Sequence, residues 1–156
     1  MALAAGEKVP EFRLLTGEGS EFTREDLADA TTVLVFYPFA FSPVCTDQLQ
    51  IYEGALADFA AKDVVLFGVS CDSTYAQTAF AEKLGITSGQ LSDFEPKGAA
   101  CRAFDTYHPG GFPQRALVIT GRDATVLWSY QADSPGELPS LELLRQGVDA
   151  ALAAAA

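Results

Sequence analysis

The chain has 156 residues, of which 49% are hydrophobic, and its formal net charge is −11 at pH 7. This length and composition favour one packed globular domain and exclude a disordered chain, because enough apolar surface is available to build a core. The excess of Asp and Glu, 21 against 10 Lys and Arg, argues against binding to nucleic acid or to an anionic membrane surface.

The first half of the chain alternates predicted strands and helices. Alternation, β-branched runs and helical spacing of apolar residues identify these elements. They are a β-hairpin of 12–15 and 20–23 around TGEG, a buried strand at 31–37, a helix from Pro43 to about Ala61, and a second buried strand at 64–70. This order predicts a βαβ unit with parallel strands.

The second half predicts two further helices, a hairpin and a terminal helix. Their expected positions are helices at 75–84 and 97–104, a β-hairpin of 116–120 and 125–130 around GRD, and a helix from Ser140 into the alanine tail. The tail is expected to be the fraying end of that helix. Together these elements predict an α/β fold in one domain, 1–156, with a mixed central sheet flanked by helices.

No segment approaches the roughly 18 apolar residues of a membrane-spanning helix, and the first residues lack the pattern of a signal peptide. We therefore expect a cytoplasmic protein. The three cysteines, Cys45, Cys71 and Cys101, contain no CxxC pair, and the sequence has a single histidine. This pattern predicts neither a disulfide framework nor a zinc site.

Cys45 lies at the predicted start of a helix. Ser42 is a suitable N-cap and Pro43 a suitable first helical residue, which makes Cys45 the third helical residue. A capping box places Glu or Gln at that position, so a thiol replaces the usual acceptor. A helix start favours an anion by at most about 2 kcal/mol. Ionising most of a thiol at neutral pH takes about 2.7 kcal/mol, so we expect a cation nearby.

Arg115 is the best candidate for that cation, because it directly precedes the apolar strand predicted at 116–120. Its planar guanidinium can hold a thiolate and a substrate oxygen at once. Considered alone, Arg115 also fits a strand end that points to water, and Cys45 fits a small buried hydrophobe. Cys71 and Cys101 are interpreted first as core thiols, either of which would trap an oxidised Cys45 if brought close.

The motif P-x-x-x-S-x-x-C, formed by Pro38, Ser42 and Cys45, resembles the active-site signature of the peroxiredoxins, P-x-x-x-T/S-x-x-C. The resemblance covers nearly the whole chain and includes GEKVPEFRL, FYPFAF, GVSCDS, LSDF and VLWSYQADSPGE. It is strongest for the alkyl hydroperoxide reductase E branch. A thioredoxin-like fold with an N-terminal β-hairpin extension is the architecture that this resemblance implies.

The resemblance also implies a function and the residues that carry it. Cys45 would be the peroxidatic nucleophile, Ser42 would hydrogen-bond the peroxide, Pro38 would shield the sulfur, and Arg115 would hold thiolate and peroxide in line. The reaction needs no cofactor and no metal. The implied partners are a hydroperoxide, an external reductant of the thioredoxin, mycoredoxin or low-molecular-weight-thiol type, and a second copy of the chain in a homodimer or larger homo-oligomer.

Some residues depart from the family pattern. Gln48 stands where many relatives carry glutamate, and Gln50 stands where the bacterioferritin-comigratory type carries its resolving cysteine. A one-cysteine mechanism is therefore favoured, with Cys101 and Cys71 as possible resolving residues. A peroxide sensor or redox relay that uses the same sulfur is the alternative. A disulfide reductase is disfavoured, since TDQ follows Cys45 in place of a nearby second cysteine.

Overall fold

The computed structural model describes residues 1–156. Nine strands are present: β1 (Arg13–Leu15), β2 (Glu21–Thr23), β3 (Thr31–Phe36), β4 (Val64–Ser70), β5 (Gly89–Ser92), β6 (Tyr107–His108), β7 (Phe112–Pro113), β8 (Ala116–Thr120) and β9 (Val126–Gln131). The helices are the 3-10 helix η1 (Arg24–Asp29) and the α-helices α1 (Pro43–Glu53), α2 (Leu56–Ala60), α3 (Thr74–Leu84), α4 (Ala99–Ala103) and α5 (Leu141–Ala155).

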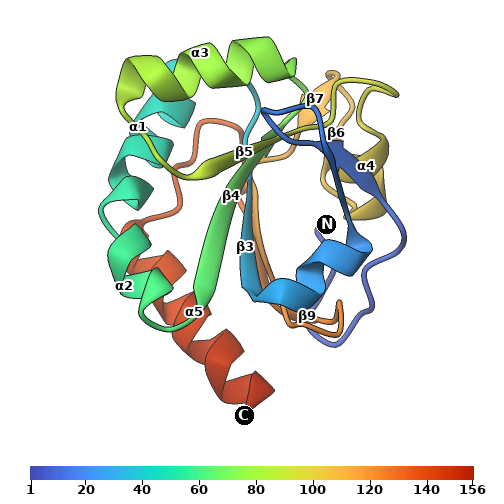
Figure 1. Ribbon diagram of the computed structural model, residues 1–156, viewed down its shortest axis with the longest axis vertical. Helices are drawn as coiled ribbons and strands as arrows, with labels where there is room; N and C mark the ends of the chain where they lie inside the picture. Colours follow the sequence, from blue (N-terminus) through green and yellow to red (C-terminus); the bar gives the residue numbers. More distant parts are fainter.

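Seven strands form one mixed sheet in the order β2-β1-β5-β4-β3-β8-β9 (Figure 1). β4 runs parallel to β3 and to β5, which confirms the predicted βαβ unit. β8 pairs antiparallel with β3 and with β9. The N-terminal hairpin of β1 and β2 joins the edge of this sheet through β5, so it extends the sheet itself.

The sheet separates two hydrophobic cores. Val33 and Val35 of β3 face a core that also contains buried residues of α1, α2, α3 and α5. Leu34 and Phe36 of the same strand face a second core that contains residues of η1, α4 and the N-terminal segment. Successive residues of a strand point to opposite faces, so one buried strand supplies both cores. Figure 1 shows the helices on either side of the sheet.

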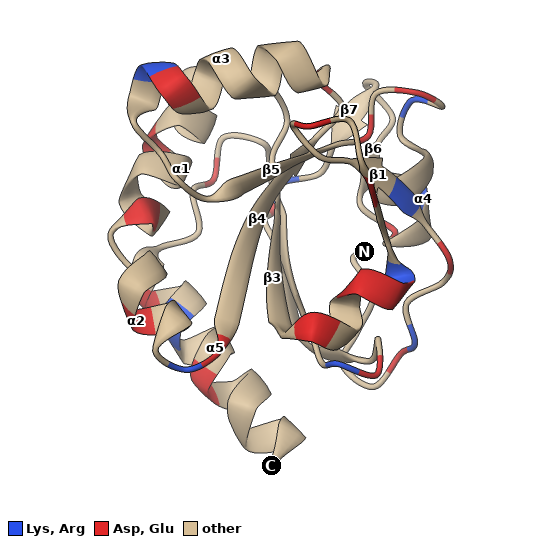
Figure 2. Cartoon of the chain, in the orientation of Figure 1, with Lys and Arg blue, Asp and Glu red and all other residues tan.

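Charged side chains lie on helices, loops and the edge hairpin of β1 and β2, whereas β3, β4 and β8 carry none (Figure 2). The acidic residues are spread over several helices and loops along the chain (Figure 2). None of the helices combines the length and the apolar character that crossing a bilayer requires.

The structure differs from the sequence prediction in one long helix and several short elements. The helix expected to reach Ala61 is interrupted at Gly54, where the amides of Gly54 and Ala55 donate to carbonyls three residues back. Such a tight turn ends α1, and glycine lowers the cost of leaving the helix there. The elements η1, β5, β6 and β7 were not predicted, because segments of two to six residues contain too few positions to show a period.

Candidate active site

The start of α1 places Cys45 at the predicted helical position. Ser42 has extended backbone angles (φ −71°, ψ 150°), Pro43 is the first residue of α1, and Cys45 is therefore the third. The Ser42 side chain differs from the expectation, because its hydroxyl accepts no hydrogen bond from the helix. It donates instead to the carbonyl of Phe39 at 2.9 Å. The hydroxyl thus fixes the loop before α1.

Arg115 contacts the Cys45 sulfur. Its Nη2 donates to Sγ at 3.2 Å, its Nη1 donates to Gln48 Oε1 at 2.6 Å, and its Nε donates to the carbonyl of Pro135 at 2.8 Å. The arginine is only 2% exposed. Each of the three nitrogens has its own acceptor, so the guanidinium plane is fixed relative to the sulfur. The structure therefore brings together the thiol and the cation that the sequence paired by hypothesis.

Gln48 and Tyr52 extend this network along one face of α1. Residues three and four apart face the same way on a helix, which aligns Cys45, Gln48 and Tyr52. Gln48 Nε2 donates to the Tyr52 hydroxyl at 3.3 Å, and that hydroxyl donates to the carbonyl of Pro139 at 2.6 Å. Burial raises the pKa of Tyr52 to about 12. The phenol thus stays protonated at neutral pH and can donate.

A cavity of about 250 Å³ adjoins the site. Its lining includes Pro38, Ser42 and Arg115, the three residues predicted to surround the thiol. Cys45 contacts Arg115 but has no exposed surface of its own. The volume is enough for a small ligand near the guanidinium and the serine hydroxyl.

Phe41, in the loop before α1, has an unusual backbone conformation. Its φ is +71°, in the left-handed region. A bulky residue in this region is strained by about 1–2 kcal/mol, and such strain concentrates at functional sites. The ring lies 5.2 Å from that of Phe80, between centroids, and this contact holds the loop against α3. No sequence pattern pointed to this strain.

Cys71 and Cys101 lie away from Cys45. Cys45 belongs to the core on the α1 face of the sheet, whereas Cys101 belongs to the opposite core and Cys71 packs against that second core. All three are free thiols. A disulfide from Cys45 to Cys101 would require a large rearrangement, because the sheet lies between the two cores. Cys71 lies just after the end of β4, in a cavity whose lining includes Pro38.

From the sequence alone, Gln48 is only a departure from the family pattern, and Tyr52 is only an apolar position of the predicted helix. The signal that could have assigned them was their spacing of three and seven residues from Cys45 on one helix. The carbonyls of Pro135 and Pro139 had no signal, since every residue carries a carbonyl and only the fold decides which ones meet a side chain.

The mixed sheet flanked by helices is a thioredoxin-like fold. The thiol at a helix start, with an arginine on its sulfur, is the arrangement that the resemblance to peroxiredoxins implies. Residues 5–129 match the model of the AhpC/TSA family. The chain belongs to this family.

Two relatives and one solved structure illustrate the similarity. The putative peroxiredoxin bcp of Coxiella burnetii is 32% identical over 93 residues, which cover 60% of this chain and 62% of that protein. Alkyl hydroperoxide reductase E of Mycobacterium bovis is 27% identical over 138 residues, 87% of this chain and 90% of that protein. The crystal structure of Enterococcus faecalis AhpC has a TM-score of 0.87 at 26% identity and covers 99% of this chain and 95% of its own. The match to the bcp relatives spans 62% to 64% of their length.

Proposed function

We propose that this chain is a thiol-dependent peroxidase that reduces hydrogen peroxide or an organic hydroperoxide at Cys45. The observation that carries the proposal is the 3.2 Å contact between Arg115 Nη2 and Cys45 Sγ. The buried guanidinium and the helix start both place positive charge beside the sulfur, where a nucleophilic thiolate would carry its negative charge. The adjoining cavity, with Ser42 and Pro38 in its wall, supplies room for a peroxide beside this pair.

The proposed reaction transfers one oxygen to sulfur. The Cys45 thiolate attacks one peroxide oxygen, the S–O bond forms as the O–O bond breaks, and the leaving oxygen departs as water or an alcohol after taking a proton. Arg115 can donate to the peroxide while it holds the sulfur, which stabilises the charge that develops on the leaving oxygen. Ser42 can donate to the peroxide once its hydroxyl turns from Phe39. Fixing both reactants in line lowers the barrier further.

We further propose a one-cysteine mechanism with an external thiol reductant. The placement of Cys71 and Cys101 across the sheet from Cys45 supports it. A thiol of the thioredoxin, mycoredoxin or low-molecular-weight type would attack the sulfenic acid, release water and form a mixed disulfide. A second thiol would then displace the Cys45 thiolate. We also propose that the chain acts in the cytoplasm as a homodimer or larger homo-oligomer; light scattering tests the oligomeric state.

The test adds one equivalent of hydrogen peroxide to the reduced protein and follows Trp128 fluorescence together with intact mass. Trp128 packs against the core cluster that contains Cys45, so it can report oxidation there. We expect rapid gain of one oxygen at Cys45 and no such gain in Cys45→Ser. The peroxidase proposal is wrong if Cys45→Ser consumes peroxide as fast as the parent chain.

Turnover separates a peroxidase from a peroxide sensor. With excess peroxide and an added thiol, a peroxidase consumes many equivalents per chain, whereas a sensor stops after one. Peptide mapping after the first equivalent also tests the one-cysteine step. A persistent sulfenic acid or a mixed disulfide with the added thiol supports it, and a disulfide from Cys45 to Cys71 or Cys101 contradicts it.

A further inference from the structure

We propose that Cys71 and Cys101 form a second redox centre, separate from Cys45, in which Cys71 exchanges with a low-molecular-weight disulfide and Cys101 closes an intramolecular disulfide. Cys71 Sγ, Cys101 Sγ and a carboxylate oxygen of Asp93 all lie within 4.8 Å of one another. The proposal does not rest on the peroxidase function, because its exchange steps use neither Cys45 nor Arg115.

The parallel pairing of two strands brings Cys71 and Asp93 together. Ser70 and Ser92 are register partners at the ends of β4 and β5. Cys71 directly follows β4, and Asp93 directly follows β5. The amide of Asp93 donates to the carbonyl of Ser70 at 2.8 Å. Carboxyl ends of parallel strands lie at one edge of a sheet, where functional groups commonly gather. The position of Cys71 is thus fixed by the central sheet.

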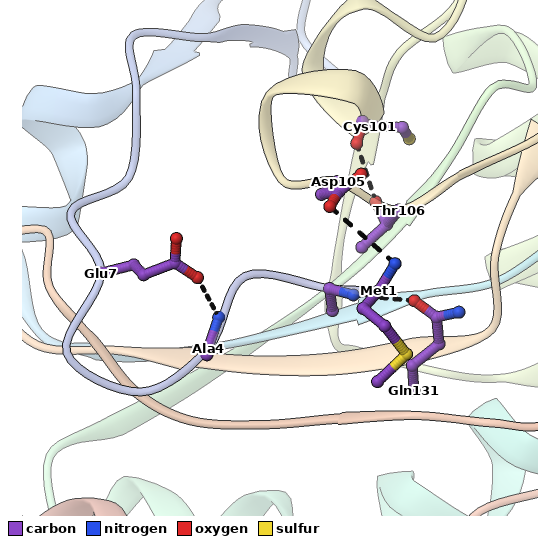
Figure 3. Close-up of polar contacts among 8 residues, drawn as sticks. Met1, Ala4, Glu7, Cys101, Asp105, Thr106 and Gln131 are labelled. Carbon is purple, nitrogen blue, oxygen red and sulfur yellow. Dashed lines mark hydrogen bonds and ion pairs between the residues drawn. The ribbon is translucent and has the colours of Figure 1, made fainter.

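Cys101 is held beside Cys71 through its own backbone. Asp93 accepts hydrogen bonds from the amides of Ala100 at 3.0 Å and Cys101 at 2.8 Å. The carbonyl of Cys101 accepts from the hydroxyl of Thr106 at 3.1 Å (Figure 3) and from the amide of the same residue at 2.7 Å. With both backbone groups tied, Cys101 is held beside Cys71, and a disulfide requires the two sulfurs to close from within 4.8 Å to about 2 Å.

The two thiols differ in a way that assigns their roles. Cys71 is partly exposed, while Cys101 is fully buried. A hydrogen bond from Cys101 lowers the pKa of the Cys71 thiol, and that same hydrogen bond, together with burial, raises the pKa of Cys101. An accessible thiolate attacks a disulfide faster than a buried thiol does. Cys71 is therefore the attacking sulfur and Cys101 the sulfur that completes the reaction.

A cavity gives a disulfide access to Cys71. It has a volume of about 290 Å³, and its lining includes Cys71, Lys97 and the exposed aromatic rings of Phe39 and Phe94. Lys97 favours the thiolate of Cys71 electrostatically, whereas burial and the carboxylates of Asp93 and Asp72 oppose it; the hydrogen bond from Cys101 is the largest effect on the pKa of Cys71 and lowers it. The lining also includes Asp72, so a small peptide disulfide that carries both carboxylate and amino groups suits the cavity. Its carboxylate can pair with Lys97, its amino group with Asp72, and its apolar part can pack on the rings.

The proposed exchange balances without a cofactor. The Cys71 thiolate attacks one sulfur of the disulfide RSSR, whose S–S bond breaks, and one RS⁻ leaves. Cys101 then gives up its proton and attacks Cys71 Sγ, and the second RS⁻ leaves. Two protein thiols and RSSR thus become one protein disulfide and two RSH, with two electrons passed to RSSR. A reducing thiol runs the same steps backward.

The test uses Cys45→Ser, so that the peroxidatic sulfur cannot contribute. The reduced protein is incubated with excess glutathione disulfide and analysed by intact mass and peptide mapping. We expect the loss of two hydrogens, a bond mapped between Cys71 and Cys101, and reversal by dithiothreitol. Adding Cys101→Ala should stop the reaction at a glutathionyl group on Cys71. Adding Cys71→Ala should slow modification of the remaining buried thiol by about tenfold or more.

Three results would overturn the proposal. The first is an unchanged mass of folded Cys45→Ser, and the second is glutathionylation of both thiols without a bond between them. The third is retention of one zinc ion by the reduced chain through gel filtration, with oxidation blocked by that ion, since two sulfurs and a carboxylate are also zinc ligands. Peptide mapping of Cys45→Ser needs no further substitution, so the proposal stays testable if a core-cysteine variant does not fold.

Discussion

Arg115 Nη2 lies 3.2 Å from Cys45 Sγ although the two residues are 70 positions apart in the chain. The contact joins the start of α1 to the start of β8 and is fully enclosed by protein, since Arg115 is 2% exposed. A guanidinium in such a setting is screened little by solvent, and its effect on the sulfur is larger than that of a surface arginine.

Replacing Arg115 tests the geometry of this contact as well as its charge. Arg115→Lys keeps a cation but cannot serve Cys45, Gln48 and Pro135 at once, so we expect kcat/KM for hydrogen peroxide to fall by about 10²-fold. In Arg115→Ala, kcat/KM should fall at least as far. The free energy of unfolding should also fall, by about 1–3 kcal/mol for each acceptor left unpaired. Arg122→Ala, at an exposed position, is the control and should change neither value. Parent-like kcat/KM in Arg115→Ala would contradict the assigned role.

Gln48→Glu tests how the charge on Arg115 is shared. A carboxylate at this position would still accept from Nη1, now 2.6 Å from Gln48 Oε1, but would neutralise part of the cation. We expect the rate of Cys45 oxidation by hydrogen peroxide to fall by about tenfold, because less positive charge is left for the sulfur and the peroxide. Gln50→Glu makes the same change on the exposed face of α1 and should leave this rate unchanged. Equal oxidation rates for the two variants would refute the argument.

Alkaline pH should destabilise the fold through buried tyrosines. The pKa of Tyr52 is raised to about 12 by burial, from an ordinary value of 10, and burial raises the pKa of Tyr37 as well. The folded state therefore binds the phenolic proton more tightly than the unfolded state does. This stability is complete below pH 10 and is lost as pH rises toward 12, with up to about 2.7 kcal/mol from Tyr52.

Urea unfolding between pH 9 and 12 measures this effect. Tyr52→Phe should make the free energy of unfolding depend less on pH in this range. It should also lower the free energy of unfolding at neutral pH by about 1–2 kcal/mol, because the hydrogen bond to the Pro139 carbonyl is lost. Tyr75→Phe removes a phenol that is 87% exposed and should alter neither property. A slope as steep in Tyr52→Phe as in the parent would show that this tyrosine is not responsible.

Gly147→Ala should destabilise the protein even though alanine is the better helix former. A Cβ at Gly147 would lie 2.6 Å from the ring of Trp128, against which α5 packs. Overpacking of this kind costs about 1–3 kcal/mol, more than the roughly 1 kcal/mol that alanine gains over glycine in a helix. Trp128 fluorescence during denaturant unfolding gives the measurement. The reverse change at an exposed position of the same helix, Ala150→Gly, calibrates the propensity. A net gain in stability for Gly147→Ala would contradict the close packing.

The position of Cys45 could be predicted from the sequence because it depends on a few neighbouring residues. Ser42 and Pro43 set the start of α1 through their own backbone preferences, and counting from them places the sulfur at the helix start. The strands at 31–37 and 64–70 were also predictable, since continuous apolar runs mark strands buried on both faces. The interruption at Gly54 was not, because a glycine inside a helical pattern is usually tolerated.

The partners of these residues were decided only by the tertiary structure. Whether Arg115 pointed to water or to Cys45 depended on the pairing of β8 with β3, which no local pattern encodes. The meeting of Cys71 with Cys101 depended on the parallel register of β4 and β5 and on two backbone hydrogen bonds to Asp93. Sequence spacing sets what a residue can do within its own element. The sheet sets which residues distant in the chain meet, because one shift of register moves every side chain of a strand to the other face.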